Sequence, residues 1–142
     1  MNHIKECLDK DSIEILDVSA GEGAFPKRLF DHDFKIEAID LDADNFKYSS
    51  IIPIYAVNPN DLGAWSSFVQ SHRSMYDILV SQETIEHLEN PWSFLRGRKE
   101  LVRLGGHLIL TTPNIESPWS KLLFILRDSS SCSAIGILNM AI

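Results

Sequence analysis

The sequence is poor in cysteine and in basic residues, and it contains no long apolar run. Its two cysteines, Cys7 and Cys132, lie far apart without CxxC spacing, so neither a zinc site nor a disulfide framework is supported. Thirteen Lys and Arg against 20 Asp and Glu give a formal net charge of −7, which disfavours nucleic acid and anionic lipid as partners. No apolar run approaches the length of a membrane span, and residues 1–11 lack the apolar core of a signal peptide. We therefore expect a soluble, cytoplasmic protein with no membrane span and no nucleic-acid partner.

Short apolar runs recur along the chain, with helix-like stretches between them. They are rich in Ile, Leu and Val, as expected for strands that are covered on both faces. The runs are Ile13 to Val18, Lys35 to Asp40, Ile51 to Val57, Tyr76 to Ser81 and His107 to Thr112. This alternation predicts a parallel sheet built from right-handed βαβ units. The expected fold class is therefore α/β, a doubly wound Rossmann-like sheet, in one domain that spans residues 1–142.

Residues 128–142 break this pattern. A Ser-rich stretch comes first, and the sequence then closes on the apolar run "AIGILNMAI". We expect these residues to form a poorly structured tail, although the apolar run could instead add an edge strand.

The stretch "ILDVSAGEGAF", Ile15 to Phe25, begins as a buried strand and turns into small residues just after Asp17. A strand, a glycine loop and a helix in this order place backbone N–H groups at the carboxyl edge of a sheet, facing a ligand. Asp40 ends the next run, where a carboxylate can accept hydrogen bonds from ribose hydroxyls. The glycines could instead serve only the positive φ angles of a turn, but the presence of Asp40 favours a nucleotide site.

The loop does not follow the dinucleotide pattern. G-x-G-x-x-G requires a third glycine, and Pro26 stands at that position here. Asp17 and Glu22 also place negative charge near the loop, which opposes a pyrophosphate and suits a cationic sulfonium ligand better. A nicotinamide cofactor is therefore disfavoured.

Several motifs that occur in order carry a family resemblance. "ILDVSAGEGAF" is followed by "AIDLD", "YDILVSQETIEHLENPWSFLRG" and "GGHLILTTPN". Together they resemble the class I S-adenosylmethionine-dependent methyltransferases, and within these the branch of the ubiquinone-biosynthesis O-methyltransferases. The resemblance extends from about Ile13 to about Arg127. It implies the cofactor S-adenosylmethionine and a small-molecule methyl acceptor.

The resemblance also implies a set of cofactor-binding residues. The glycine loop would surround the methionine part of the cofactor, Asp40 would hold its ribose, and Leu41 would pack on its adenine. Ser81 and Gln82 would lie near the transferred methyl group. In full, the implied cofactor-binding residues are Asp17, Ser19, Ala20, Gly21, Gly23, Asp40, Leu41, Asn58, Asp61, Ser81 and Gln82.

Two positions depart from the family pattern. Ser19 stands where the family often has glycine, and a serine fits there if its φ angle stays negative. After the third strand the family usually has an Asp that binds the adenine amino group, whereas this sequence has Asn58 and Pro59. Asn58 can accept through its amide oxygen, but Pro59 has no N–H to donate. An alternative register uses Asp61, and an ordinary turn is equally compatible with these residues.

The stretch "QETIEHLE" contains a second group of candidate site residues. Glu83, Glu86 and His87 stand at i, i+3 and i+4, which in a helix is one face. Two carboxylates and an imidazole could bind Mg²⁺, Mn²⁺ or Zn²⁺, and the resemblance includes relatives in which similar motifs are metal ligands. Alternatively, the carboxylates favour a helix N-terminus and His87 is a packing residue. Without a metal, His87 is the leading candidate for a catalytic general base.

The expected function is methyl transfer from S-adenosylmethionine to a small-molecule acceptor. An oxygen acceptor is favoured by the resemblance and by the possible metal site. In the family, two further strands and helices before the first strand complete the fold and help to select the substrate. Those segments are short or missing here, so the sequence looks like a methyltransferase core with trimmed ends. The alternative function is a non-catalytic S-adenosylmethionine-binding or remnant domain that acts through a partner.

Overall fold

The computed structural model describes residues 12–113 and 133–138. In this part of the chain, strands alternate with α-helices and two short 3₁₀ turns. The elements are β1 Glu14–Val18, α1 Ala24–Phe30, β2 Lys35–Asp40, η2 Ala43–Asn45, β3 Ile54–Ala56, α2 Leu62–Ser71, β4 Tyr76–Gln82, η3 Ile85–His87, α3 Pro91–Leu101, β5 Val102–Pro113 and β6 Ser133–Leu138.

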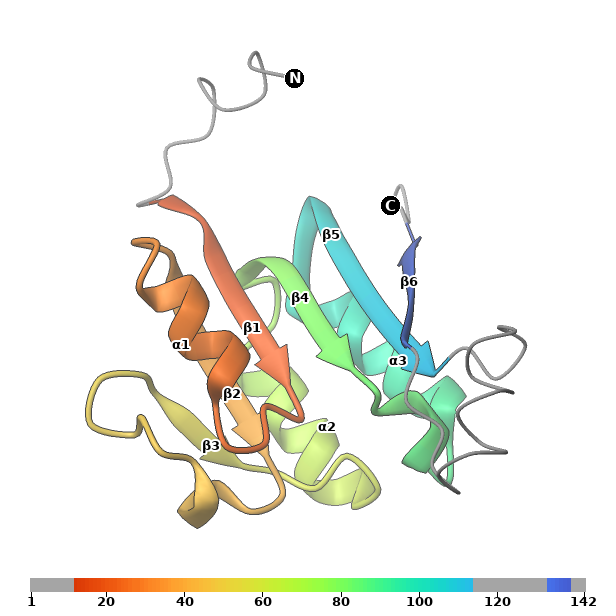
Figure 1. Cartoon of the computed structure of the whole chain (residues 1–142). Helices are drawn as coiled ribbons and strands as arrows, with labels where there is room; N and C mark the ends of the chain where they lie inside the picture. The colour runs from red at the N-terminus through yellow and green to blue at the C-terminus, as the bar shows by residue number, and fades with distance from the viewer. Residues whose placement is uncertain (1–11, 114–132, 139–142) are drawn as a thin grey trace, which may run out of the picture.

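The strands form one sheet in the order β3-β2-β1-β4-β5-β6 (Figure 1). Neighbours from β3 to β5 run parallel, and β6 runs antiparallel to β5. The strand order reverses between β1 and β4, and open α/β sheets bind their ligands at the carboxyl ends of the strands beside such a reversal. The predicted doubly wound Rossmann-like fold is confirmed.

Helices cover both faces of the sheet. Figure 1 shows α1 on one face and α2 and α3 on the other. Ile15 and Val80 belong to the core cluster on the α1 side, whereas Leu16 and Val18 belong to the cluster beneath α2 and α3. Successive residues of β1 thus enter opposite clusters, which explains why the strand is apolar throughout rather than alternating. Within the described ranges, no helix combines the length and the apolar character that a membrane crossing requires.

The central strands begin and end close to the predicted positions, but β3 is shorter than predicted. It covers Ile54–Ala56 of the predicted run Ile51 to Val57. Pro53 has no N–H for the strand ladder, so regular pairing starts only after it. Ile52 is fully buried even so, because the apolar run also contributes side chains to the core outside the strand.

β5 is longer than predicted and begins at Val102 rather than His107. The pairing register between β4 and β5 shifts after Tyr76. Gly105 has a φ angle of 81°, and a Cβ atom on Gly106 would lie 2.6 Å from the backbone oxygen of Asp77. The two glycines therefore allow the bulge that joins the start of β5 to the regular ladder.

The predicted tail contains a strand. Residues Ser133–Leu138 pair antiparallel with β5, from Leu108↔Leu138 to Pro113↔Ser133. The expectation of a poorly structured tail therefore does not hold for these residues, and the alternative of an edge strand is observed. The rest of the predicted tail, residues 128–132 and 139–142, lies outside the described residues.

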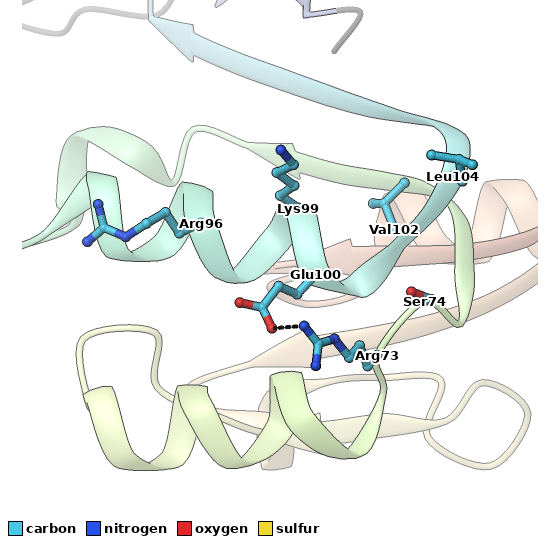
Figure 2. Close-up of a pocket in the computed structure, with 7 residues that line it drawn as sticks. All are labelled: Arg73, Ser74, Arg96, Lys99, Glu100, Val102 and Leu104. Atoms are coloured by element: carbon cyan, nitrogen blue, oxygen red, sulfur yellow. Dashed lines mark ion pairs between the residues drawn. The ribbon is translucent and has the colours of Figure 1, made fainter. Parts of the chain in front are cut away.

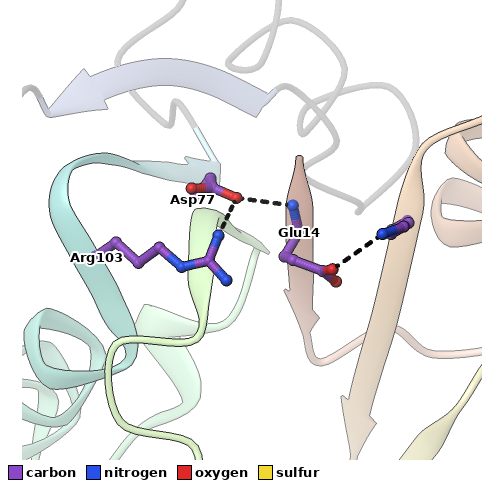
Figure 3. A network of polar contacts seen from close by, with 4 residues as sticks. Glu14, Asp77 and Arg103 are labelled. Atoms are coloured by element: carbon purple, nitrogen blue, oxygen red, sulfur yellow. Dashed lines mark hydrogen bonds and ion pairs between the residues drawn. The ribbon is translucent and has the colours of Figure 1, made fainter. Parts of the chain in front are cut away.

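A polar network ties the strands together at the amino edge of the sheet (Figure 3). Asp77 Oδ2 accepts hydrogen bonds from Glu14 N at 2.9 Å and from Arg103 Nη1 at 2.7 Å. Glu14 in turn pairs with Lys35 at 3.5 Å. These contacts join the first residues of β1 and β2 to the second residues of β4 and β5, so the charges at this edge hold the strands together. The glycine loop lies at the opposite edge.

Candidate functional site

The loop between β1 and α1, residues 19–23, is held by backbone contacts at the carboxyl edge. The N–H groups of Ser19 and Ala20 both donate to the carbonyl of Ile39 in β2, at 2.8 and 3.1 Å. Gly23 N donates to the carbonyl of Ala20 at 3.0 Å and closes a turn. The loop is therefore fixed against β2 by the protein's own backbone.

The two glycines of the loop serve different purposes. Gly21 and Gly23 have positive φ angles of 55° and 92°, in the left-handed region that favours glycine. A Cβ atom on Gly23 would lie 2.6 Å from the ring of Phe46, so packing also excludes a side chain there. A Cβ atom on Gly21 would meet nothing within 4 Å. The space at Gly21 is therefore open to a ligand.

Asp40 fixes the loop from the end of β2. Its Oδ2 accepts a hydrogen bond from Gly21 N at 2.7 Å, and its Oδ1 accepts from Asp42 N at 2.9 Å. Charged acceptors form stronger hydrogen bonds than neutral ones. The predicted ribose-binding residue and the predicted glycine loop are thus joined by a direct contact, which was not predicted from the sequence.

Asp17 is a buried acidic residue of β1, two residues before the loop, and it is only 3% exposed. Burial raises its pKa from 3.8 to about 7, the negative charge of Asp40 adds to the increase, and the positive charge of Arg98 opposes it. A cationic group that approaches this carboxyl would favour its ionised form. Asp17 therefore matches a positively charged ligand better than an anionic one.

Arg98 of α3 is a buried residue that sequence analysis missed. Its guanidinium lies 3.9 Å from the ring centroid of Phe94, and none of its three side-chain nitrogens has a hydrogen-bond partner among the described residues. Burial lowers its pKa to about 9, against the effect of Asp17. The signal was present in the sequence, because Phe94, Arg98 and Leu101 recur at the spacing of one helix face and form the buried stripe of α3.

Three other predicted cofactor residues lie at the ends of β2 and β4. Leu41 is 67% exposed and offers an apolar surface beside Asp40. Gln82 ends β4 and is exposed at the same edge. Ser81 is only 1% exposed, and its hydroxyl lies in the protein interior without a partner among the described residues. The structure therefore brings Leu41 and Gln82, but not the Ser81 hydroxyl, to the surface of the candidate site.

The two candidates for the adenine contact are used within their own loop. Asn58 Oδ1 accepts from Asn60 N at 2.9 Å. Asp61 is the N-cap of α2, and its Oδ1 accepts from Gly63 N and Ala64 N at 2.9 and 3.0 Å. The local hydrogen bonds of this stretch are therefore those of a turn. A ligand contact by Asn58 or Asp61 remains a prediction.

The predicted metal cluster does not have the predicted geometry. Glu83 has a φ angle of 50° and precedes a 3₁₀ turn that spans only Ile85–His87, so Glu83, Glu86 and His87 do not share a face of one α-helix. Among residues 12–113 and 133–138, no group of three or more His, Cys, Asp or Glu side chains is arranged to hold a metal ion. The expectation rested on helical spacing, and the left-handed backbone at Glu83 removes that spacing.

Ser19 adopts a backbone conformation opposite to the expected one. Its φ angle is 67°, whereas a negative value was expected. The two backbone bonds to Ile39 hold this stretch in place. A non-glycine residue in the left-handed region costs of the order of 1–2 kcal/mol. A glycine at this position, as the family often has, would adopt this φ angle without strain.

Replacing Ser19 by glycine is expected to raise the free energy of unfolding by about 1 kcal/mol, because glycine adopts this φ angle without strain. Urea denaturation measures the change. Ser66→Gly, at an exposed position inside α2, is the control and should lower stability by about 0.5 kcal/mol. Equal losses in both variants would show that Ser19 is not strained.

A hollow of about 570 Å³ lies at the opposite end of the helices, with Arg73, Arg96 and Lys99 around it (Figure 2). Arg73 forms an ion pair with Glu100 at 3.3 Å. Arg73 lies just after α2, and Lys99 lies in the last turn of α3, where positive charge is favourable beside the helix dipole. The helix ends therefore account for Arg73 and Lys99 without a ligand, whereas Arg96 is an exposed residue in the middle of α3.

The sheet order, the glycine loop at the carboxyl edge and Asp40 at the end of β2 define a domain of the Rossmann-like class. Within this class, the profile of a family described as "Methyltransferase domain" matches residues 2–130. The chain belongs to this methyltransferase family, and the resemblance inferred from its motifs is confirmed.

Curated relatives carry names that agree with this family. A ubiquinone biosynthesis O-methyltransferase of Leptothrix cholodnii is 26% identical over 131 residues, which cover 89% of this chain and 55% of that protein. A protein of the same name from Rickettsia felis is 32% identical over 110 residues, which cover 75% of this chain and 43% of that protein. The chain thus spans about half the length of the curated relatives it matches.

Solved structures share the fold. A SAM-dependent methyltransferase from Archaeoglobus fulgidus matches with a TM-score of 0.66 at 17% identity, over 84% of this chain and 53% of that one. The 1,6-didemethyltoxoflavin-N1-methyltransferase of Burkholderia thailandensis, solved with S-adenosylhomocysteine bound, matches with a TM-score of 0.55 at 15% identity. The match covers 71% of this chain and 45% of the chain of that methyltransferase. These matches confirm the class I methyltransferase fold.

Proposed function

We propose that this chain binds S-adenosylmethionine at the carboxyl edge and belongs to a protein that transfers its methyl group to an oxygen of a small-molecule acceptor. The observation that carries the proposal is the contact between Asp40 and Gly21, at 2.7 Å, beside the open space at Gly21. The contact supports the proposal, because a carboxylate and a glycine with open space beside it lie together at the edge where sheets of this kind bind nucleotides. The family match supports this cofactor over other nucleotides.

The described residues fit the parts of this cofactor. Asp40 can accept hydrogen bonds from ribose hydroxyls, and the exposed Leu41 offers an apolar contact for adenine. Asp17 favours a positively charged ligand, because a cation would offset the cost of its buried charge. When bound, the cofactor supplies an electrophilic methyl group on a sulfonium. The chain's own task is then to orient the acceptor, to exclude water and to accept a proton.

His87 is the proposed general base. It ends the turn after β4 and is exposed at the edge that also carries Gln82. An imidazole at this position can remove the proton of an acceptor hydroxyl. The oxygen acceptor is supported by the names of the curated relatives, which are O-methyltransferases.

Replacing Asp40 by alanine is expected to weaken binding of S-adenosylhomocysteine about 10- to 30-fold, because the variant loses the ribose acceptor and the anchor of Gly21 N. Asp40→Asn keeps one acceptor oxygen and should lose less. Isothermal titration of the full chain measures both, with Asp33→Asn as an exposed control. NAD should not compete. Competition by NAD, or equal affinity in wild type and Asp40→Ala, would contradict the proposed site.

A methyl-transfer assay with phenolic acceptors tests the second half of the proposal. Turnover that is lost in His87→Ala would support methyl transfer to oxygen with His87 as base. Cofactor binding without turnover would instead favour the alternative function, a non-catalytic domain that acts through a partner.

A further inference from the structure

We propose that Asn60 is a positioning residue that fixes the segment carrying His87. This inference rests on the proposed function, since it concerns the residue proposed as general base. Asn60 Nδ2 donates to the backbone oxygen of His87 at 3.4 Å, and Asn60 Oδ1 accepts from Glu89 N at 2.9 Å. One side-chain amide thus binds the main chain on both sides of Leu88.

The two contacts together require an amide side chain. The oxygen must face the N–H of Glu89 and the nitrogen must face the carbonyl of His87, so only one orientation of the Asn60 amide satisfies both. Aspartate would keep the acceptor for Glu89 N but place a carboxylate oxygen against the carbonyl of His87. Alanine would remove both contacts.

The turn that precedes α2 holds Asn60 in place. Asn58 Oδ1 accepts from Asn60 N at 2.9 Å, and Asp61 N donates to the carbonyl of Asn58 at 3.0 Å. Asp61 then caps α2. The sequence "NPND" after β3 therefore forms a rigid turn that presents the Asn60 amide.

The segment that Asn60 binds has few bonds of its own. After the 3₁₀ turn Ile85–His87, the chain becomes extended at Leu88, with φ −89° and ψ 134°. His87 N and Leu88 N donate back within the turn, at 3.0 and 3.4 Å. The next backbone N–H, that of Glu89, is satisfied by Asn60, which lies 29 residues away in the sequence. The contact therefore fixes where the backbone of His87 lies relative to the loop after β3.

A double-mutant cycle with Asn60→Ala, His87→Ala and both together tests this role. We expect Asn60→Ala to lower kcat for methyl transfer about tenfold, since a small misplacement of a base is costly. S-adenosylhomocysteine affinity should change by less than about threefold. In the His87→Ala background, Asn60→Ala should have no further effect, because it acts through His87. Gln70→Ala, an exposed amide on α2, is the control.

Amide hydrogen exchange tests the contact independently of turnover. Exchange at Glu89 N–H should be about tenfold faster in Asn60→Ala and near wild type in Asn60→Asp, which keeps the acceptor. Unchanged exchange at Glu89 in Asn60→Ala would overturn the inference, as would additive losses of kcat in the double variant. If no acceptor is methylated, the proposed function fails, and the exchange rates alone then decide whether Asn60 holds the segment.

Discussion

Replacing Arg98 by methionine is expected to raise the free energy of unfolding by about 2–4 kcal/mol at neutral pH. Arg98 is fully buried, and its guanidinium contacts the Phe94 ring but has no hydrogen-bond partner among the described residues. The cation–π contact and the attraction of Asp17, whose own pKa is raised to about 7, recover only part of the cost of burying this charge without hydrogen bonds. Methionine has a similar length, keeps a favourable contact with an aromatic ring and carries no charge.

The stability gained in Arg98→Met should decrease at high pH. Burial lowers the pKa of Arg98 to about 9 in the folded protein, so between about pH 9 and the higher pKa of the unfolded chain the unfolded state binds more protons. The free energy of unfolding of the wild type should therefore increase as pH rises above 9, because Arg98 loses its buried charge. The advantage of Arg98→Met should be full at pH 7 and smaller at pH 10.

Urea denaturation of both proteins at pH 7 and pH 10 measures this effect. Arg96→Met is a matched control, because Arg96 lies on the same helix but is exposed, and its stability should change by less than about 0.5 kcal/mol. A variant at Arg98 that is less stable than wild type would mean that the guanidinium is well paired in the folded protein. The interpretation of Arg98 as a poorly compensated buried charge would then be wrong.

The sequence predicted the sheet, and the place of Asp40 at the end of a strand, because both depend on local patterns. Apolar runs indicated β1, β2 and β4, and the position of Asp40 at a strand end follows directly from its run. β5 was predicted too short because its start contains Gly105 and Gly106, which are read as a helix end or a turn. Only the pairing with β4 shows that these glycines lie in a bulge.

The residues that were missed or misread depend on backbone conformation or on tertiary contacts. The three residues of the predicted metal cluster do not share a helix face, because Glu83 has a left-handed backbone conformation. The helical spacing of "ETIEH" does not predict this conformation. The contact of Asn60 with Glu89 joins two loops, and no periodicity reports such a contact. Arg98 was the exception, since its place on the stripe of Phe94 and Leu101 was readable. Patterns of neighbouring residues in the sequence were therefore enough to predict the strands and helices. The contacts between loops at the candidate site could be found only in the structure.

Replacing Asp17 by asparagine is expected to stabilise the protein above about pH 7 by about 4 kcal/mol, an upper bound set by the shift in pKa from 3.8 to about 7. Between these values the unfolded state has lost the proton that the folded state retains, so wild-type stability falls as pH rises from about 4 to about 7. Burial is the main cause, with Asp40 second. Asparagine cannot ionise and should remove this fall.

The same substitution should weaken cofactor binding, which separates the stabilising effect from the functional one. S-adenosylmethionine carries positive charge, so its affinity for wild type should rise as pH increases through about 7 and Asp17 ionises. In Asp17→Asn the affinity should be lower at pH 8 and should no longer rise with pH.

Calorimetric titration at pH 6 and pH 8, with Asp33→Asn as an exposed control, measures this pH dependence of the affinity. A wild-type affinity that is equal at both pH values would show that Asp17 does not face the cofactor's charge. Higher stability together with weaker binding in one variant would mean that the protein retains a destabilising buried carboxyl because the ligand requires it.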